Sequence, residues 1–391
     1  MRPAHVRMWR AALTALMSVR QPSPEVLVAG FPDTEENAHV AALELVARYG
    51  VKVTMLAKDP AVARRHMEAV EDWMGHGGIS QKVDIVRRER IRDARAIVRA
   101  QVVMYTHGLS ASPAPRGRRL HVNLWHGTGA KRSANTAFTN AIGASAISAN
   151  AAHWARQTAD DLLMSNVTVL PGTLREALYS PEPSASALSK LGLEVPFVLW
   201  MPTYRTTTTE STRVLRDGTE FSDSSFGELV QMLANTAESR GVRLLVKAHP
   251  LDPFEWGSLG VTQVTNEWLA DAGVPLYGLI GQASGMISDY SSAWVDFLRL
   301  DRPLLLCVPD LERYTATRGL KSPPFYEIME YALCTSPTHA EAFFESVATN
   351  RSANHSVARE ALGFTDSPDV VGTFFAKLEL LAAQAGVTMF K

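Results

Sequence analysis

The chain has 391 residues, of which 46% are hydrophobic and 20% are charged. These fractions are close to globular averages and exclude a disordered or fibrous protein, and the length predicts two domains rather than one. Lys and Arg number 39 against 40 Asp and Glu. Because this balance gives no general attraction to polyanions, we expect no nucleic-acid partner.

The two cysteines and the apolar runs indicate the compartment. Cys307 and Cys334 lie in apolar surroundings without metal-site spacing, which is typical of a protein in a reducing compartment. No apolar run reaches the roughly 18 residues that a membrane-spanning helix needs. We therefore expect a cytoplasmic protein, and the segment described next suggests that it is peripheral on the inner face of the cell membrane.

Residues 1–20 form a basic amphipathic segment. Its arginines and apolar residues are Arg2, Arg7, Arg10 and Arg20 with Val6, Met8, Trp9, Leu13, Leu16 and Met17. Such a helix could lie on an anionic membrane surface or pack on its own domain, and the sequence leaves both open. A signal peptide is disfavoured, because no small-residue cleavage site precedes the strand-like run Val26–Ala29.

Residues 21–178 alternate between strand and helix patterns. The predicted elements are strands Val26–Gly30, Lys52–Leu56, Val83–Val86, Val102–Tyr105 and His121–Leu124, with helices Glu35–Tyr49 and Ala61–Met74. This alternation predicts a Rossmann-like lobe with a doubly wound parallel sheet.

Residues 179–391 repeat the alternation after a segment rich in Pro, Ser and Ala, Gly172–Gly192, which predicts an interdomain linker. The predicted elements are strands Phe197–Met201, Arg243–Lys247, Gly285–Ser288 and Leu304–Val308, with helices Phe226–Arg240 and Ser291–Leu298. Two such lobes predict an α/β protein of the GT-B type, with both lobes facing a central cleft. The polar run Thr206–Thr212 predicts an exposed loop, with a lid as the alternative.

The first candidate site is the segment Leu124–Lys131, which follows an apolar strand. Ligands of open α/β sheets gather at the carboxyl ends of strands. Gly127 and Gly129 would let the backbone approach a ligand closely, and Lys131 adds a positive charge. The imidazole of His126 titrates near neutral pH and would serve as a base. Gly127, Thr128 and Lys131 are assigned to acceptor binding or to support of the site.

Two further strand ends carry positive charge. Arg205 follows the strand Phe197–Met201 and offers a forked donor suited to phosphate. Lys247 and His249, two residues apart at the end of the next strand, would lie on one face and stabilise a diphosphate leaving group. An edge strand with incidental polar residues is the alternative for this pair.

The fourth candidate segment runs from a strand into a helix. Ser291 and Ser292 would lie at the helix N-terminus, where free backbone N–H groups favour an anion. Ordinary N-capping by Asp289 or Ser291 would explain much of the same pattern. Only the four segments taken together favour an anion site at Asp289, Ser291 and Ser292 over simple N-capping.

Taken together, these motifs resemble the CDP-glycerol glycerophosphotransferase family of teichoic acid synthesis. The residues that carry the resemblance are His126–Thr128, Pro202–Arg205, Lys247–Pro250, Asp289–Ser292, Arg302, Pro303, Pro309–Leu311, Tyr314, Arg318 and Gly319. Their order and approximate spacing match the family over residues 120–320, and the chain length resembles the shorter, priming-type members.

The resemblance implies a GT-B fold, with residues 21–178 as the acceptor-side lobe and residues 179–391 as the CDP-donor-binding lobe. It implies His126 as the catalytic base and His249 as a catalytic partner of the donor phosphates. It places Arg205, Ser291 and Ser292 on the donor diphosphate, and we add Lys247 and Asp289 to the donor-binding set. It includes Asp310 and Arg318 without defining their roles, and we assign both to acceptor binding or support. The chain departs from the family pattern at Gly129 and Ala130 and again at Leu320–Pro324.

The reaction that follows is transfer of a polyol phosphate, with glycerol phosphate first, from a CDP-polyol to a lipid-linked or polymeric hydroxyl acceptor. No cofactor and no metal are expected, since the sequence has no paired-Asp or Cys/His ligand motif. A GT-B glycosyltransferase that uses a UDP-sugar and a non-catalytic membrane-peripheral binding protein are the alternatives. The identity of the polyol, the identity of the acceptor, and the choice between priming and polymerising stay open.

Overall fold

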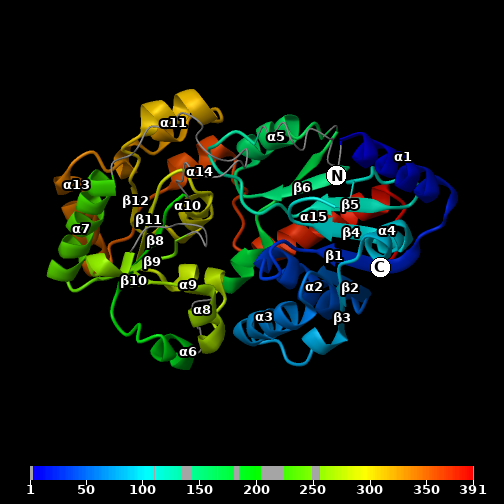
Figure 1. The fold of residues 1–391 in the computed structure, drawn as a ribbon, viewed down its shortest axis with the longest axis horizontal. Helices are drawn as coiled ribbons and strands as arrows, with labels where there is room; N and C mark the ends of the chain where they lie inside the picture. Colours follow the sequence, from blue (N-terminus) through cyan, green and yellow to red (C-terminus); the bar gives the residue numbers. More distant parts are fainter. Residues whose placement is uncertain are drawn as a thin grey trace. The chain divides into compact units, whose positions relative to one another are not determined.

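The computed structural model describes residues 3–109, 111–133, 143–164, 166–179, 185–203, 223–248 and 256–390. The predicted loop Thr206–Thr212 and two predicted site residues, Arg205 and His249, lie outside the described residues. The chain divides into two compact units (Figure 1). The first unit contains Met1–Thr128, Ser133–Ser180 and Gly363–Lys391, and the second contains Gly129–Arg132 and Pro181–Leu362.

The first unit is built on a seven-stranded sheet of order β3-β2-β1-β4-β5-β6-β7, in which every pairing is parallel. The strands are β1 Ser23–Ala29, β2 Lys52–Ala57, β3 Val83–Arg87, β4 Ala100–Tyr105, β5 Leu120–Asn123, β6 Ala146–Ala149 and β7 Thr168–Pro171. All six residues of β4 are buried. Continuous burial is expected of a parallel strand that has helices on both faces.

Helices cover both faces of this sheet. They are α1 Pro3–Val19, α2 Glu36–Tyr49, α3 Pro60–Trp73, α4 Arg90–Arg99, α5 Ala152–Asp161 and α15 Val370–Gln384, with 3-10 turns η1 Ser80–Lys82 and η3 Leu174–Tyr179. Helices α1 and α4 share a core with Leu27 and Ala29 of β1. The alternate β1 residues Val26 and Val28 point to the opposite face and are also buried.

The second unit contains a five-stranded parallel sheet of order β10-β9-β8-β11-β12. Its strands are β8 Phe197–Met201, β9 Arg243–Val246, β10 Thr262–Gln263, β11 Gly285–Ser288 and β12 Leu304–Leu306. Its helices are α6 Ala185–Lys190, α7 Asp223–Ser239, α8 Asn266–Ala272, α9 Leu276–Gln282, α10 Ala293–Phe297, α11 Leu311–Arg318, α12 Phe325–Ile328, α13 Pro337–Ala348 and α14 Ser356–Leu362, with 3-10 turns η4 Trp256–Leu259, η5 Leu298–Leu300 and η6 Glu330–Ala332. Helices α7 and α13 share a core with β8 and β9.

The fold class predicted from the sequence is confirmed: the protein is α/β, with two Rossmann-like parallel sheets. The predicted linker Gly172–Gly192 is wrong over its first part. Leu174–Tyr179 forms η3, and Leu174 and Leu178 are almost fully buried in the first unit. Apolar burial against α2 and α15, which are far away in sequence, overrides the local Pro and Ser composition.

The division of the chain also differs from a boundary at residue 179. The last segment, Gly363–Lys391, returns to the first unit, and Figure 1 shows the red helix α15 among the blue and cyan elements. Phe374, Phe375 and Leu378 of α15 are buried there.

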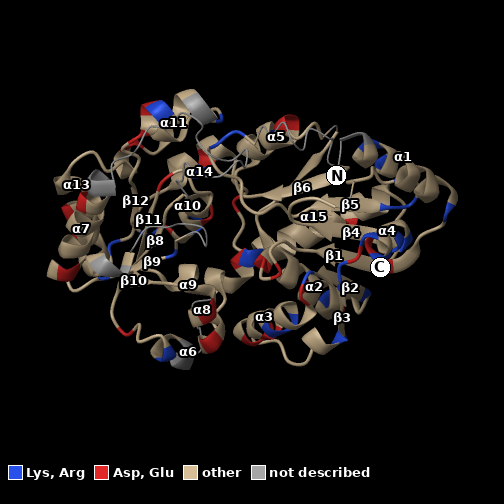
Figure 2. Cartoon of the chain, viewed as in Figure 1, with Lys and Arg blue, Asp and Glu red and all other residues tan. Residues whose placement is uncertain are grey.

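Helix α1 is packed on the first unit through Leu13 and Met17, each 1% exposed. The remainder of the helix keeps Met8, Leu16 and Val19 at the surface. Within the described part of the chain, no helix combines the length and the apolar character needed to cross a membrane. Figure 2 shows basic and acidic residues interspersed in both units, in keeping with the neutral balance of the sequence.

Candidate active site

Both sheets bring polar residues to the place where the strand order reverses. In the first sheet the order reverses between β1 and β4, and in the second between β8 and β11. Ligands of open α/β sheets bind outside the carboxyl ends of the strands at such a point. Thr106 and His107 follow β4 in the first unit, while Thr203 and Asp289 follow β8 and β11 in the second.

The segment after β5 has a backbone shaped by local hydrogen bonds. Trp125 has a φ of 54° and Gly127 a φ of 130°, values that L side chains adopt rarely. The Trp125 N–H donates to Asn123 Oδ1 at 2.9 Å, and Asn37 Nδ2 donates to the Trp125 carbonyl at 3.3 Å. These bonds turn the chain sharply and present the next side chain, His126, at the strand end.

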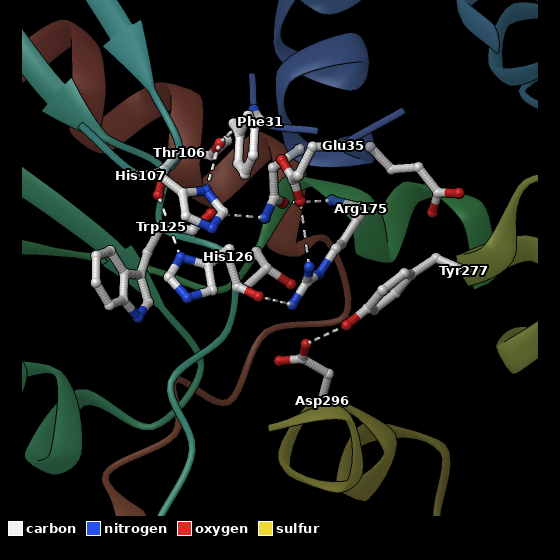
Figure 3. A network of polar contacts seen from close by, with 12 residues as sticks. Phe31, Glu35, Thr106, His107, Trp125, His126, Arg175, Tyr277 and Asp296 are labelled. Atoms are coloured by element: carbon white, nitrogen blue, oxygen red, sulfur yellow. Dashed lines mark hydrogen bonds and ion pairs between the residues drawn. The ribbon is translucent and has the colours of Figure 1, made fainter. Parts of the chain in front are cut away.

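The imidazole of His126 is half-buried and held on several sides (Figure 3). Its Nδ1 lies 3.5 Å from the Thr106 carbonyl oxygen. The ring stacks on His107 with centroids 3.8 Å apart and planes inclined by 12°, and it contacts Trp125 at a centroid distance of 4.2 Å. Since a carbonyl only accepts, this contact requires a proton on Nδ1.

A buried ion pair supports the backbone of the same segment. Arg175 donates from Nη1 to Glu35 Oε1 at 3.3 Å and from Nη2 to the His126 carbonyl at 3.3 Å. Burial raises the pKa of Glu35 to about 7, although the neighbouring Arg175 guanidinium opposes the shift. Removing one partner of such a pair is costly because it leaves a buried group uncompensated. The Glu35–Arg175 pair therefore fixes the position of the His126 backbone.

The residues after His126 are divided between the units. Thr128 belongs to the first unit and is 3% exposed, and its hydroxyl finds no hydrogen-bond partner among the described residues. Gly129–Arg132 belongs to the second unit. There Lys131 forms an antiparallel bridge with Leu320.

A buried lysine secures this second part. Lys321 is 3% exposed, its Nζ donates to the Gly129 carbonyl at 2.7 Å, and its N–H donates to the Ala130 carbonyl at 2.7 Å. A Cβ on Gly129 would lie 3.1 Å from the Ser292 Cβ and 3.3 Å from the Ser292 N. The two places where the chain departs from the family pattern are thus paired with each other, and one of them packs on Ser292.

In the second unit, Asp289 joins the ends of β8 and β11. Its carboxylate accepts the Thr203 N–H at 2.9 Å, the Thr203 hydroxyl at 2.7 Å and the Ser291 N–H at 3.2 Å. Asp289 is 1% exposed. A buried carboxylate with three protein donors organises the loops that follow β8 and β11.

The remaining donor-side residues are more open. Ser291 and Ser292 are partly exposed and precede α10, Ala293–Phe297, whose five residues give it only a small dipole. Lys247 is half-buried at the end of β9, and burial lowers its pKa below the ordinary value against the opposing effect of Glu267. Lys247, Ser291 and Ser292 thus lie at carboxyl ends of the second sheet.

Asp310 supports the segment that follows β11 in the second unit. Its Oδ1 accepts the Tyr290 hydroxyl at 2.8 Å, and the Tyr290 ring stacks on Tyr314 with centroids 3.5 Å apart. Asp310 therefore fixes the side chain of Tyr290, which lies between Asp289 and Ser291 in the sequence. Arg318 ends α11, and Gly319 follows it.

Sequence reasoning missed three residues at the His126 segment: His107, Glu35 and Arg175. The only local signal was that Thr106–His107 follows a predicted strand, as Leu124–Lys131 does. Arg175 fell within the predicted linker, and its partner Glu35 is 140 positions away. Among the described residues, no cluster of three or more His, Cys, Asp or Glu is arranged to hold a metal ion.

Comparison with known proteins identifies the second unit. A family model described as CDP-Glycerol:Poly(glycerophosphate) glycerophosphotransferase matches residues 184–366. The matched residues make up slightly less than half of the chain. The resemblance seen in the sequence motifs is thereby confirmed, and the family match contains Lys247, Asp289, Ser291, Ser292 and Asp310.

One curated relative supports the same family. The teichoic acid glycerol-phosphate primase of Bacillus spizizenii is 28% identical over 151 residues, which are 38% of this chain and 35% of that relative. The chain therefore matches about a third of the length of this relative.

Solved structures show the fold over almost the whole chain. A structure of the wall teichoic acid polymerase TagF has a TM-score of 0.66 at 14% identity and covers 97% of this chain and 94% of its own. The MnaA–UDP structure of S. aureus has a TM-score of 0.52 at 9% identity and covers 94% of this chain and 98% of its own. At these identities the likeness concerns the fold, which agrees with the two parallel sheets.

Proposed function

We propose that the chain transfers a polyol phosphate, glycerol phosphate in the first place, from a CDP-polyol donor to a hydroxyl group, and releases CMP. The acceptor is a lipid-linked or polymeric chain in the synthesis of a teichoic-acid-like or capsular polymer. The observation that carries the proposal is the family match over residues 184–366. The primase relative and a TagF structure soaked with CDPG support the same chemistry.

The acceptor oxygen attacks the phosphorus that bears the glycerol, and the bond from that phosphorus to the CMP oxygen breaks. The proton of the acceptor hydroxyl passes to Nε2 of His126, and CMP leaves with the bonding electron pair. The Nδ1 contact with the Thr106 carbonyl supports this role, because a neutral imidazole that carries its proton on Nδ1 has no proton on Nε2. The buried Thr128 hydroxyl is a candidate contact for the acceptor.

The donor diphosphate carries charge that must be stabilised as the bond breaks. We assign this task to Lys247, Ser291 and Ser292, together with Arg205 and His249 outside the described residues. Asp289 and Asp310 hold the loop that carries the two serines. Lys131 and Arg318 remain supporting residues in this proposal.

The decisive experiment supplies the purified chain with CDP-glycerol, CDP-ribitol or a UDP-sugar in the presence of an extracted acceptor. Release of CMP with a product heavier by one glycerol phosphate supports the proposal. Release of UDP instead would establish a sugar transferase, and binding without release of either nucleotide would establish a non-catalytic protein. The mass of the product identifies the polyol.

Two variants test the assignment of the histidines. His126→Ala should lower kcat about 10³-fold or more while CDP-glycerol affinity stays within about threefold, as expected for a general base that acts in the transition state. His249→Ala should damage both kcat and donor affinity, because its proposed partner is the donor phosphate. A folded His126→Ala protein with a normal rate would remove His126 from the mechanism.

We further propose that the protein associates with the inner face of the membrane through the outer side of α1. Met8 and Val19 are 68% and 80% exposed there, and Arg7, Arg10 and Arg116 line a hollow of about 550 Å³ beside them. A Met8→Ser/Val19→Ser variant leaves the buried Leu13 and Met17 intact. This variant should bind vesicles of anionic phospholipid more weakly than the wild type does. The difference between the two proteins should be larger at high salt. Unchanged partitioning would leave α1 as a packed helix only.

A further inference from the structure

The two cysteines of the chain lie side by side in the second unit, although they are far apart in the sequence. Cys307 directly follows β12, and Cys334 comes shortly after the turn η6. Leu306 and Leu333 form a parallel bridge, and the Cys334 N–H donates to the Leu306 carbonyl at 2.9 Å. Residues that follow a bridged pair on parallel segments are themselves neighbours, so the bridge places the two cysteines next to each other.

The two side chains also share one face. Side chains alternate along an extended segment, so Cys307 points to the same side as Leu305. Both are buried in the core that α7 and α13 share with β8 and β9, and Cys334 packs against that core. Neighbouring strands lie about 4.8 Å apart, within the Cα separation of about 4.4 to 6.8 Å that a disulfide spans. The two residues are present as thiols, but their placement suits a disulfide.

The two thiols differ in how an oxidant can reach them. Cys307 is 4% exposed, whereas Cys334 is partly exposed. A hydrogen bond with the Cys307 side chain lowers the pKa of the Cys334 thiol, although burial opposes the shift. The thiolate is the nucleophilic form of cysteine, and it reacts where solvent has access. A soluble oxidant therefore meets Cys334 first, with Cys307 beside it.

The segment between the two cysteines, residues 308–333, carries side chains that support the rest of the second unit. Asp310 accepts the Tyr290 hydroxyl, and Lys321 donates to the Gly129 carbonyl. A covalent bond between the two sulfurs would join the start of this segment to its end. Closing a loop in this way stabilises a fold mainly by restricting the unfolded chain.

We propose that Cys307 and Cys334 form a redox modification site, at which a peroxide converts the two thiols into a disulfide that closes the segment 308–333. A small dithiol reverses the reaction by thiol–disulfide exchange. Disulfides that form and break again are the kind found in a reducing compartment, where they serve in redox sensing. The alternative is that both cysteines only fill the core as small apolar side chains.

The chemistry has two steps when the oxidant is hydrogen peroxide. The Cys334 thiolate attacks one peroxide oxygen, the O–O bond breaks, and a sulfenic acid and a hydroxide ion are formed. The Cys307 sulfur then attacks the sulfenic sulfur. The S–S bond forms, the S–O bond breaks, and the oxygen leaves as water with the Cys307 thiol proton. The two sulfurs together lose two electrons, and the peroxide gains them.

The test treats the purified full chain with a small molar excess of hydrogen peroxide, removes the excess with catalase, and alkylates the remaining thiols after unfolding. Mass spectrometry of an unreduced digest should show one joined peptide pair, linked through Cys307 and Cys334 and lighter by two hydrogen atoms than the separate peptides. Dithiothreitol should restore both thiols. Two thiols that stay open to alkylation, or a Cys334 sulfinic acid beside an intact Cys307 thiol, would overturn the proposal.

Two single variants separate the roles of the sulfurs. Cys307→Ser lacks the second thiol, so it should keep a sulfenic acid on Cys334 that dimedone traps. Cys334→Ser keeps only the buried sulfur, which should react with peroxide at least about tenfold more slowly. If the remaining cysteine reacts equally fast in both variants, the assignment of Cys334 as the attacking sulfur is wrong.

Urea unfolding measures the consequence for the fold. The oxidised wild type should unfold at a higher urea concentration than the reduced wild type, because the disulfide restricts the unfolded chain. Cys307→Ser/Cys334→Ser is the matched control and should have the same midpoint before and after peroxide. Equal midpoints for the two wild-type forms, or an equal rise in the double variant, would contradict closure of the segment. None of these measurements uses a donor or an acceptor, so their outcome is independent of the proposed function.

Discussion

A single buried carboxylate, that of Asp289, joins two strand ends in the second unit. It accepts two hydrogen bonds from Thr203 and one from Ser291. Through these bonds the end of β8 and the residues before α10 take one arrangement. Under the proposed function, the Asp289 carboxylate would therefore act on the donor indirectly, through Ser291 and Ser292.

Asp289→Asn should lower both stability and donor affinity. The amide nitrogen would face N–H donors, so the variant should lose about 1 to 3 kcal/mol of unfolding free energy. It should also weaken CDP-glycerol binding, measured by calorimetry on folded protein. Asp296→Asn is the matched control, because Asp296 is equally buried in the same unit and accepts the Tyr277 hydroxyl at 2.7 Å. It should lose stability alone, and equal loss of affinity in both variants would contradict the role of Asp289.

Residues differ in how far the sequence reveals them. His126 and Ser291 were predictable because each follows a recognisable apolar strand in a motif. Arg175 was not, because a charged residue in a segment rich in Pro and Ser gives no local sign of its partner Glu35, 140 positions away. His107 was hidden for a similar reason, since its significance comes from a ring in the next strand of the sheet.

Strands were predictable where large apolar residues form a continuous run or lead into a polar motif. β8 and β11 have the predicted bounds, and β2 differs by one residue. β6, with the sequence Ala-Ile-Ser-Ala, was missed because small residues give little strand signal. This short strand is stable because its neighbours in the sheet and the covering helices bury all four of its residues.

The paired segments Gly129–Arg132 and Gly319–Lys321 form a short antiparallel contact in the second unit. Gly129→Ala would place a Cβ against Ser292 at 3.1 to 3.3 Å. The Ser292 backbone is part of this contact and cannot rotate away, so we expect weaker donor binding. Gly227→Ala is the control, because nothing lies within 4 Å of its added Cβ and helix propensity predicts a gain of about 1 kcal/mol. Calorimetry with CDP-glycerol distinguishes them, and equal affinities would show that Ser292 tolerates displacement.

Helices α2 and α3 enclose two histidines that make the first unit sensitive to acid. Burial lowers the pKa of His39 to about 4 and that of His66 to about 3. The rings meet edge-on at 4.9 Å. Unfolded histidine titrates at about 6.5, so between about pH 6.5 and pH 4 the unfolded state binds more protons than the folded state.

The contribution of these histidines to the free energy of unfolding should therefore be complete above about pH 6.5. It should fall as the pH drops, by up to about 1.4 kcal/mol per pH unit for each histidine. Urea unfolding at pH 7.5 and pH 5 measures this slope. His66→Phe should flatten it, while His5→Ala, at an exposed position, should not. A slope that His66→Phe leaves unchanged would assign the acid sensitivity to other groups, with His121 as the next candidate because burial lowers its pKa to about 4.

The polypeptide as a whole passes between the two units four times, after Thr128, Arg132, Ser180 and Leu362. Its last helix, α15, completes the first unit. Phe374 and Leu378 are fully buried, and Tyr49 donates a 2.6 Å hydrogen bond to Glu379. The first unit therefore needs α15 to complete its core.

Phe374→Ala should destabilise the protein by about 3 to 5 kcal/mol, the usual cost of emptying a buried phenylalanine site. Leu380→Ala lies on the same helix, but Leu380 is 60% exposed, so its effect should stay within about 0.5 kcal/mol. Thermal unfolding followed by circular dichroism compares the two. If both variants melted like the wild type, α15 would not be an integral part of the first unit.

The position of Gly129–Arg132 has a consequence for how such proteins can recombine. A gene fragment encoding Pro181–Leu362 looks like a transferable cassette, yet it omits four residues of the second unit that are encoded about fifty codons upstream. The Lys321 ammonium in the cassette would then meet a foreign backbone in place of the Gly129 carbonyl. Exchange of donor specificity between relatives by a single crossover at the unit boundary is thus disfavoured, and chimeras should work best when the upstream tetrapeptide travels with the cassette.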